Sequence, residues 1–190
     1  MLNSFPILLA SRSPRRKELL TQAGYQFTCC EANINETPLL DEKPTDLVLR
    51  LSSLKAKTIQ NQNPNTIIIG SDTMVTLNEK IYGKPQNRLD AIQMLQTFSE
   101  KTQQVITGVC ILHPNYPDWI RCITTEVTFK KLTIEIIKKY FALVNPLDKA
   151  GAYGIQSHGN QIIASISGSL NNVIGLPTEA FPEYIKSMRL

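Results

Sequence analysis

The apolar segments of this chain are short, and their order limits the fold more than any other feature of the sequence. The compact run 66–69 has the length of a β-strand, whereas 133–144 repeats its apolar residues with the period of a helix. The segments 103–112 and 120–129 carry the alternation and β-branched residues of an antiparallel pair. Because strand-like and helix-like segments interleave, the sequence predicts a mixed α/β sheet with flanking helices rather than a doubly wound parallel sheet.

The remaining elements follow from the same patterns. Besides 133–144, helices are expected over 14–23, after Pro44, over 89–98 and over 178–188. Besides the strands named above, strands are expected at 5–10, 25–30 and 161–166, and the segment 74–77 is expected to continue the strand 66–69. The run Gly70-Ser71-Asp72 is expected at the end of the buried strand 66–69. Since no repeat or linker divides its 190 residues, we expect a single domain over 1–190.

Composition and charge exclude several classes of function. A net charge of +4 favours an anionic small ligand, but the sequence has no basic stripe with aromatic residues, so nucleic acid is not the expected partner. We find neither a secretory signal nor an apolar run long enough to cross a membrane. The four cysteines form no C-x-x-C pair, which predicts free buried thiols and a location in the reducing cytoplasm.

Two arginines at the start of the first expected helix indicate an anion site. Ser13 is a suitable N-cap and Pro14 fits the first helical position, so Arg15 and Arg16 fall in the first turn. Cations in this turn add to the positive end of the helix, which is unfavourable unless an anion binds there. A triphosphate would accept hydrogen bonds from both the backbone N–H groups and the guanidinium groups. The alternative is a pair of solvated surface arginines.

One carboxylate and two lysines are further candidates for phosphate chemistry. Asp72 could bind Mg²⁺ or orient a water molecule, although a turn or N-cap aspartate is an equally good explanation of this residue alone. Lys55 and Lys84 could each reach a phosphate as point charges, or be ordinary surface lysines. Asp72-Thr73-Met74 lacks the second aspartate of a phosphoaspartate enzyme, and no P-loop motif occurs.

Five ordered motifs at these spacings resemble the Maf family of nucleotide pyrophosphatases, over residues 9–177. The motifs are Leu9-Ala10-Ser11-x-Ser13-Pro14-Arg15-Arg16, Ser71-Asp72-Thr73, Gly83-Lys84-Pro85, the run from Asp148 to Gln156, and Gly168-Ser169 with Asn172-Val173-x-Gly175-Leu176-Pro177. The resemblance implies an elongated Maf or ITPase-like mixed α/β fold, with two lobes around a nucleotide cleft. It also implies a homodimer, a divalent cation (Mg²⁺ or Mn²⁺), and hydrolysis between the α and β phosphates.

The resemblance also assigns roles to individual residues. Asp72 would be the catalytic carboxylate, and Glu36 and Asp72 the metal ligands. The phosphate contacts would be Ser11, Arg16, Lys55 and Lys84. The sequence departs from the family pattern at Asn35, which replaces an acid before Glu36, and at Ser52, which replaces an alanine.

Three further positions imply a pyrimidine substrate. Arg15, Thr73 and Gln156 match the relatives that act on dTTP and UTP, rather than those that act on 7-methyl-GTP. The neutral amide of Gln156 can pair with the O4 and N3–H edge of uracil or thymine, whereas a carboxylate suits cationic methylated guanine. The expected reaction therefore converts dTTP or UTP to the monophosphate and pyrophosphate, with possible roles in removing modified nucleotides and in cell division arrest. The alternatives are a non-enzymatic nucleotide-binding or nucleic-acid-binding regulator, and a house-cleaning enzyme for noncanonical purine triphosphates.

Overall fold

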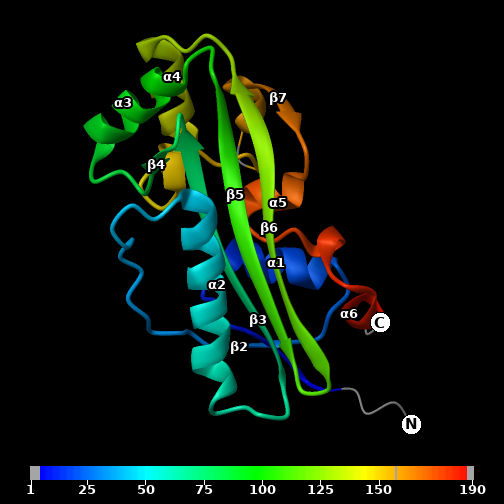
Figure 1. Cartoon of the computed structure of the whole chain (residues 1–190). Coiled ribbons are helices and arrows are strands. Elements are labelled where there is room, and N and C mark those ends of the chain that lie inside the picture. The colour runs from blue at the N-terminus through cyan, green and yellow to red at the C-terminus, as the bar shows by residue number, and fades with distance from the viewer. Residues whose placement is uncertain (1–4, 157, 188–190) are drawn as a thin grey trace. The chain divides into compact units, whose positions relative to one another are not determined.

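The computed structural model describes residues 5–156 and 158–187 (Figure 1). Its helices are α1 (Pro14–Gln22), α2 (Pro44–Gln60), α3 (Arg88–Phe98), α4 (Ile134–Leu143), α5 (Leu170–Ile174) and α6 (Glu183–Lys186). Short 3₁₀ turns cover Ala150–Ala152, Gly159–Gln161 and Thr178–Ala180. None of the helices in this described part is long and apolar enough to span a membrane.

The strands form one mixed sheet. They are β1 (Ile7–Leu9), β2 (Thr28–Cys29), β3 (Ile67–Leu77), β4 (Lys80–Tyr82), β5 (Thr102–His113), β6 (Tyr116–Phe129) and β7 (Ile163–Ser167). The order is β2-β1-β3-β5-β6-β7, with β4 paired to β3. β1 runs parallel to β2 and β3, whereas the β3–β4 and β6–β7 pairs are antiparallel. The predicted fold class, a mixed α/β sheet with flanking helices, is confirmed.

The chain divides into two compact units. The first contains the described residues up to Thr73, together with Thr107–Ile123 and the described residues from Gly175 onward. The second contains Met74–Ile106 and Thr124–Ile174. The strands β3, β5 and β6 each contribute residues to both units.

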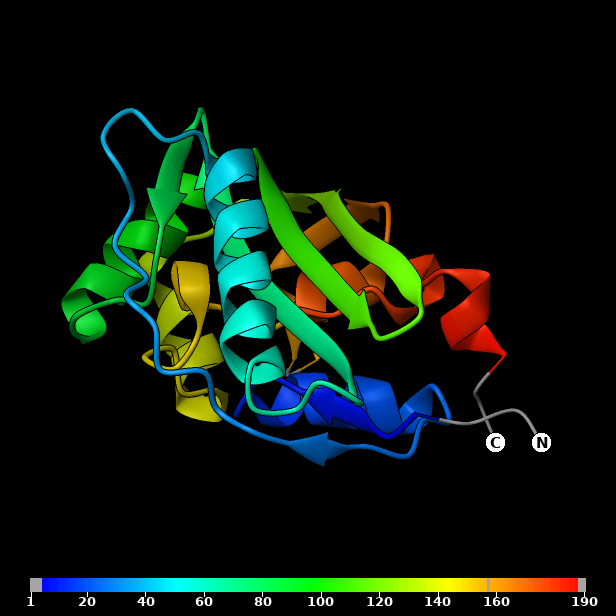
Figure 2. The same cartoon turned by 60° about the horizontal axis from the view of Figure 1, so that its bottom comes forward.

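In the first unit, α2 and α1 cover opposite faces of the sheet (Figures 1 and 2). Ala56 and Ile59 of α2 pack against buried residues on the strands or directly after them: Leu8, Ala10, Ile68, Cys110 and Leu112. Two glycines let α2 approach the strands closely. A Cβ at Gly70 of β3 would lie 2.2 Å from the Ser52 carbonyl oxygen, and one at Gly108 of β5 would lie 2.1 Å from that of Val48.

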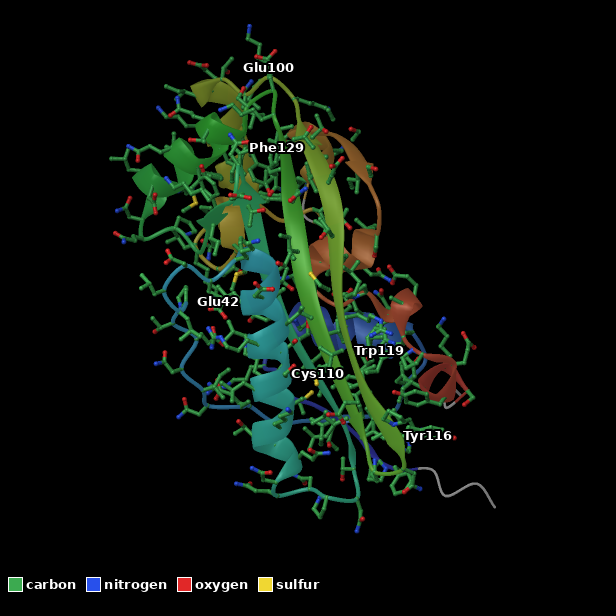
Figure 3. All side chains as sticks on the ribbon, in the orientation of Figure 1. Glu42, Glu100, Cys110, Tyr116, Trp119 and Phe129 are labelled. Carbon is green, nitrogen blue, oxygen red and sulfur yellow. The ribbon has the colours of Figure 1, made fainter. Side chains whose placement is uncertain are left out.

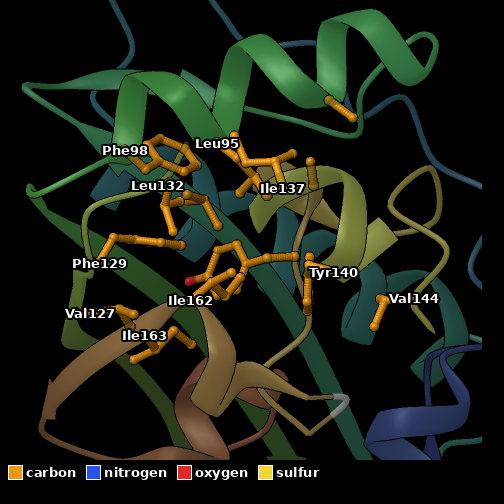
Figure 4. Close-up of a cluster of buried hydrophobic side chains, with 14 of the residues drawn as sticks. Leu95, Phe98, Val127, Phe129, Leu132, Ile137, Tyr140, Val144, Ile162 and Ile163 are labelled. Carbon is orange, nitrogen blue, oxygen red and sulfur yellow. The ribbon is translucent and has the colours of Figure 1, made fainter. Parts of the chain in front are cut away.

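The second unit has its own aromatic core (Figure 4). Phe98 of α3, Phe129 of β6 and Tyr140 of α4 are almost completely buried in it, and the rings of Phe98 and Phe129 lie 5.4 Å apart. Helix α4 begins as its sequence predicts, because the side chain of Thr133 accepts a hydrogen bond from the Ile136 amide at 3.4 Å. This core supports the segment that carries Gln156.

Two expectations about the elements are wrong. The strand expected at 66–69, with 74–77 as its continuation, has no end at Gly70-Ser71-Asp72, because β3 runs without a break from Ile67 to Leu77. Polar residues in a buried strand interrupt its apolar pattern and therefore resemble a strand end. The helix expected over 178–188 is, in its described part, a 3₁₀ turn followed by the short helix α6, and Pro182 separates the two. Residue 188 lies outside the described residues.

The four cysteines, all in the described part of the chain, are free. Cys110 is buried between α2 and the sheet (Figure 3), and burial raises the pKa of its thiol to about 11. Cys122 is half-buried, but Cys29 and Cys30 are exposed, so the expectation of buried thiols is wrong for this pair. Their exposure follows from the position of β2 at the edge of the sheet.

Candidate active site

Three charged side chains of the first unit meet at one point. The ammonium nitrogen of Lys55, on α2, lies 2.6 Å from Oδ1 of Asp72 on β3. The same nitrogen lies 2.7 Å from Oε1 of Glu36, in the loop that precedes α2. Lys55 and Asp72 are each only 8% exposed, whereas the Glu36 side chain is 58% exposed. The structure thus brings together the predicted catalytic carboxylate, its predicted metal partner and one predicted phosphate contact.

The packing of α2 on Gly70 explains how Lys55 reaches Asp72. Gly70 lies two residues before Asp72 and contacts Ser52 and Ala56, which flank Lys55 on the helix. A charge of either sign at this depth is costly unless it is paired, and here each partner neutralises the other. Lys55 is therefore a buried ion-pair partner, and the alternative of a surface lysine is wrong for this residue.

Arg16 is the centre of a second polar cluster in the same unit. Its Nε donates to the Gly175 carbonyl oxygen at 2.9 Å, Nη1 to Ser11 Oγ at 3.3 Å and Nη2 to Thr73 Oγ1 at 3.1 Å. Burial lowers the pKa of Arg16, and the negative charge of Asp72 acts in the opposite direction. Because an arginine stays charged despite such a shift, the cluster keeps a fixed cation near Asp72. The alternative of a solvated surface arginine is wrong for Arg16.

The start of α1 has the predicted cap. Ser13 is the N-cap and accepts a hydrogen bond from the Arg16 amide at 3.4 Å, while Pro14 occupies the first position of the helix. Ser11 Oγ in turn accepts from the Ser13 amide at 3.2 Å. Arg15, in the same first turn, is half-buried.

Residues that received no individual role from the sequence complete this cluster. The Gly175 carbonyl accepts a second hydrogen bond, from Ser71 Oγ at 3.1 Å, and Thr107 Oγ1 lies 3.0 Å from Thr73 Oγ1. Gly175 has a φ of +126°, a conformation that favours glycine, so its position before Leu-Pro was a usable signal. No sequence signal points to Thr107, because this residue of β5 comes close to Thr73 of β3 only in the folded sheet.

The other two predicted site residues belong to the second unit. Lys84 and Gln156 are both exposed there. A hydrogen bond from the Gly151 amide to the Gly83 carbonyl, 3.0 Å long, connects the segments that carry them. The Tyr140 hydroxyl holds Gly154, accepting from its amide at 2.9 Å and lying 3.2 Å from its carbonyl oxygen.

Comparison with known proteins places this arrangement in a family. A family model described as "Maf-like protein" matches residues 6–188. The chain belongs to the Maf-like family. The resemblance seen in the sequence motifs is thereby confirmed.

Similar proteins extend the match over nearly the whole Maf-like chain. A protein of Pasteurella multocida named "dTTP/UTP pyrophosphatase" is 44% identical over 186 residues, covering 93% of this chain and 92% of that protein. A Bacillus anthracis protein of the same name is 41% identical over 188 residues, covering 97% of this chain and 96% of its own. The prediction of an enzyme of the nucleoside triphosphate pyrophosphatase class is confirmed by these relatives.

A solved structure gives a weaker match. It is titled a nucleoside-triphosphatase and dITP/XTP pyrophosphatase from Mycobacterium abscessus, with a TM-score of 0.41 and 12% identity. The match covers 66% of this chain and 73% of that one. At this TM-score the likeness is too low to support a statement about the fold.

Glu36 and Asp72 are the residues of this Maf-like site that could hold a divalent cation. The described residues contain no group of three or more histidines, cysteines, aspartates or glutamates that could do so. Mg²⁺, however, commonly takes only one or two protein carboxylates and completes its coordination with water and substrate phosphates. Two carboxylates that already converge on the ammonium group of Lys55 fit this kind of site.

Proposed function

We propose that this Maf-like chain hydrolyses dTTP and UTP to the monophosphate and pyrophosphate with the help of a divalent cation. The convergence of Glu36 and Asp72 on Lys55 is the observation that carries the proposal. It provides oxygen ligands for a cation beside a fixed positive charge. The names of relatives that are 41–44% identical over more than nine-tenths of the chain support the choice of substrate.

In the proposed reaction, Asp72 and Glu36 hold the cation, which when bound supplies positive charge to the phosphate oxygens. Asp72 also orients the attacking water or accepts its proton. Lys55 keeps the Asp72 carboxylate in a single orientation through their 2.6 Å contact. Because little covalent chemistry is needed from the protein in phosphoryl transfer, these positioning and charge effects account for most of the catalysis.

The phosphate chain is proposed to bind at Ser11, Arg16, Lys55 and Lys84. Arg16 has five N–H groups, and within the described residues three of them donate hydrogen bonds, to Gly175, Ser11 and Thr73. The remaining two are available to a phosphate oxygen, while the hydrogen bonds already made fix the plane of the guanidinium group. Arg16 is thus proposed both to bind phosphate and to hold Ser11 and Thr73 in place.

Base recognition is proposed for Gln156, with Arg15 and Thr73 contributing to specificity. The Gln156 amide offers one acceptor and two donors on a single planar group, which matches the O4 and N3–H edge of uracil and thymine. The contacts of Tyr140 with Gly154 limit the movement of this segment. We also propose that a second copy of the chain is its partner in a homodimer.

The test is a turnover panel of the common and methylated nucleoside triphosphates with Mg²⁺ or Mn²⁺. We expect dTTP and UTP to be cleaved fastest, with pyrophosphate rather than phosphate as the second product. Release of phosphate, or a preference for purine nucleotides, would contradict the proposal. Tight nucleotide binding without turnover would instead favour the alternative of a non-enzymatic regulator.

Replacing Gln156 by glutamate tests the base contact. The carboxylate has the same size but loses the amide donor and places an unpaired acceptor against O4. A mispaired polar contact of this kind costs about 1–3 kcal/mol, so kcat/KM for dTTP and UTP should fall roughly 5- to 150-fold with little change in Tm.

The matched control is Gln93→Glu, which makes the same change on the exposed surface of α3. This control variant should leave kcat and KM for dTTP and UTP unchanged. If Gln156→Glu behaves like this control, Gln156 does not contact the base.

A further inference from the structure

The loop that carries Glu36 has little apolar anchorage of its own. The segment 31–43, described throughout, forms neither helix nor strand, and every residue from Asn35 to Asp41 is exposed. Leu40 is 94% and Leu39 60% exposed. A loop of this kind is expected to sample many conformations, because no apolar side chain of residues 35–41 is buried to oppose the entropy of disorder.

Besides the contact of Lys55 with Glu36, a second ion pair holds this loop against α2. Arg50 donates from Nε to Glu42 Oε1 at 2.6 Å and from Nη2 to Glu42 Oε2 at 2.7 Å, a bidentate contact. The Glu42 side chain, labelled beside α2 in Figure 3, is only 7% exposed, so solvent screens this ion pair less than an ordinary surface pair. The hydrogen bond from Arg50 is the main cause of the lowered pKa of Glu42, which falls to about 2, so the pair stays ionised at neutral pH.

The same two residues also form hydrogen bonds with the backbone close to Glu36. Arg50 Nη2 donates to the Thr37 carbonyl oxygen at 3.2 Å, and Glu42 Oε2 accepts from the Leu39 amide at 2.9 Å. Thr37 directly follows Glu36, whose carboxylate contacts Lys55 at 2.7 Å. Helix α2 therefore holds two consecutive loop residues, one through Arg50 and the other through Lys55.

We propose that Arg50 and Glu42 form a clamp that positions Glu36 at the active site. They are positioning residues, because neither needs to touch the nucleotide or the cation. The clamp limits the conformations of residues 36–42, so that the Glu36 carboxylate stays beside Asp72 before the cation and the substrate bind. This inference rests on the proposed role of Glu36 in holding the cation.

The first test measures the loop without any substrate. In Glu42→Gln, which keeps the size of the side chain but removes its charge, the Leu39 amide should exchange its hydrogen about 10-fold faster or more, as expected for the loss of a charge-assisted hydrogen bond. Arg50→Lys keeps the charge but loses the bidentate geometry, and should show a smaller increase. Unchanged exchange over residues 36–42 in both variants would overturn the clamp, whether or not the chain hydrolyses dTTP.

The second test links the clamp to Glu36. We expect Glu42→Gln to weaken the binding of Mn²⁺ alone by several-fold and to lower kcat for dTTP about 10-fold, without changing the preference for dTTP and UTP over GTP. The control is Glu183→Gln, which breaks the exposed Lys186–Glu183 ion pair on α6 and should leave these values unchanged.

A double-mutant cycle then identifies the residue through which the clamp acts. If Glu42 works through Glu36, adding Glu42→Gln to Glu36→Gln should cause almost no further loss of kcat or of Mn²⁺ affinity. Fully multiplicative losses would show that the two residues act independently and would overturn the proposal. A wild-type chain without dTTP or UTP turnover would refute the proposed function instead, and the hydrogen-exchange result would still decide whether the clamp exists.

Discussion

Asp72→Asn should leave a folded protein with almost no turnover. Asparagine keeps the size of the side chain but removes the charge that is proposed to hold the cation and to activate water. Because a positioned general base alone contributes about 10²–10⁴-fold, kcat for dTTP should fall by at least this factor. Lys55 keeps its contact with Glu36 at 2.7 Å, so the buried ammonium group is not left unpaired and the fold should survive.

Steady-state kinetics and a thermal melt of the same sample check both parts of this prediction. Asp46→Asn is the matched control, because it removes an exposed carboxylate from the first turn of α2. It should retain wild-type kinetics. Activity of Asp72→Asn within a few-fold of wild type would assign catalysis to another residue, with Glu36 as the next candidate.

Gly70→Ala should cause a large loss of stability, because a methyl group at this position collides with the backbone of α2. The new Cβ would lie 2.2 Å from the Ser52 carbonyl oxygen and 2.9 Å from the Ala56 amide nitrogen, both in the backbone of α2. Since no side chain can rotate away, the helix itself must move, at a cost of about 3 kcal/mol or more. For a chain of 190 residues this corresponds to a fall in Tm of roughly 6–12 °C.

The control for this stability measurement is Gly83→Ala. A Cβ at Gly83 would meet no described atom within 4 Å, so its Tm should stay close to that of the wild type. Movement of α2 would also displace Lys55 from Asp72, and the Gly70 variant should therefore lose activity below its melting temperature. Equal Tm values for the two variants would mean that the contact between α2 and β3 is looser than the structure indicates.

Much of the fold could be predicted because its local signals agree with its tertiary structure. The helices α1, α3 and α4 begin at side-chain caps that can be read from the sequence, Ser13, Asn87 and Thr133. The strands β5 and β6 follow from their alternation. The prediction failed where polar residues are buried for another reason: Ser71 and Asp72 interrupt an apolar strand because they serve the polar site, not because the strand ends there.

The charged residues of the candidate site could be predicted from the sequence, but the residues that hold them in place could not. Asp72 and Arg16 stand in recognisable motifs and Lys55 lies on an expected helix, and the structure places all three in one unit. Thr107 and Arg50 could not be found in this way. Thr107 acquires its role only from the packing of β5 in the sheet, and Arg50 only from the return of an exposed loop onto α2.

The two glycine contacts of α2 have a consequence for how this enzyme family can diverge. Gly70 and Gly108 lie on neighbouring strands and let successive turns of the helix pack directly against the strand backbone. Lys55 is thus carried by a helix that packs closely on the sheet, whereas Glu36 is carried by an exposed loop whose lengthening costs only about 0.6 kcal/mol for each doubling of its length. Natural or engineered change in the reaction should therefore accumulate in the loop before α2, while the helix and the two strand glycines that it packs against remain constant.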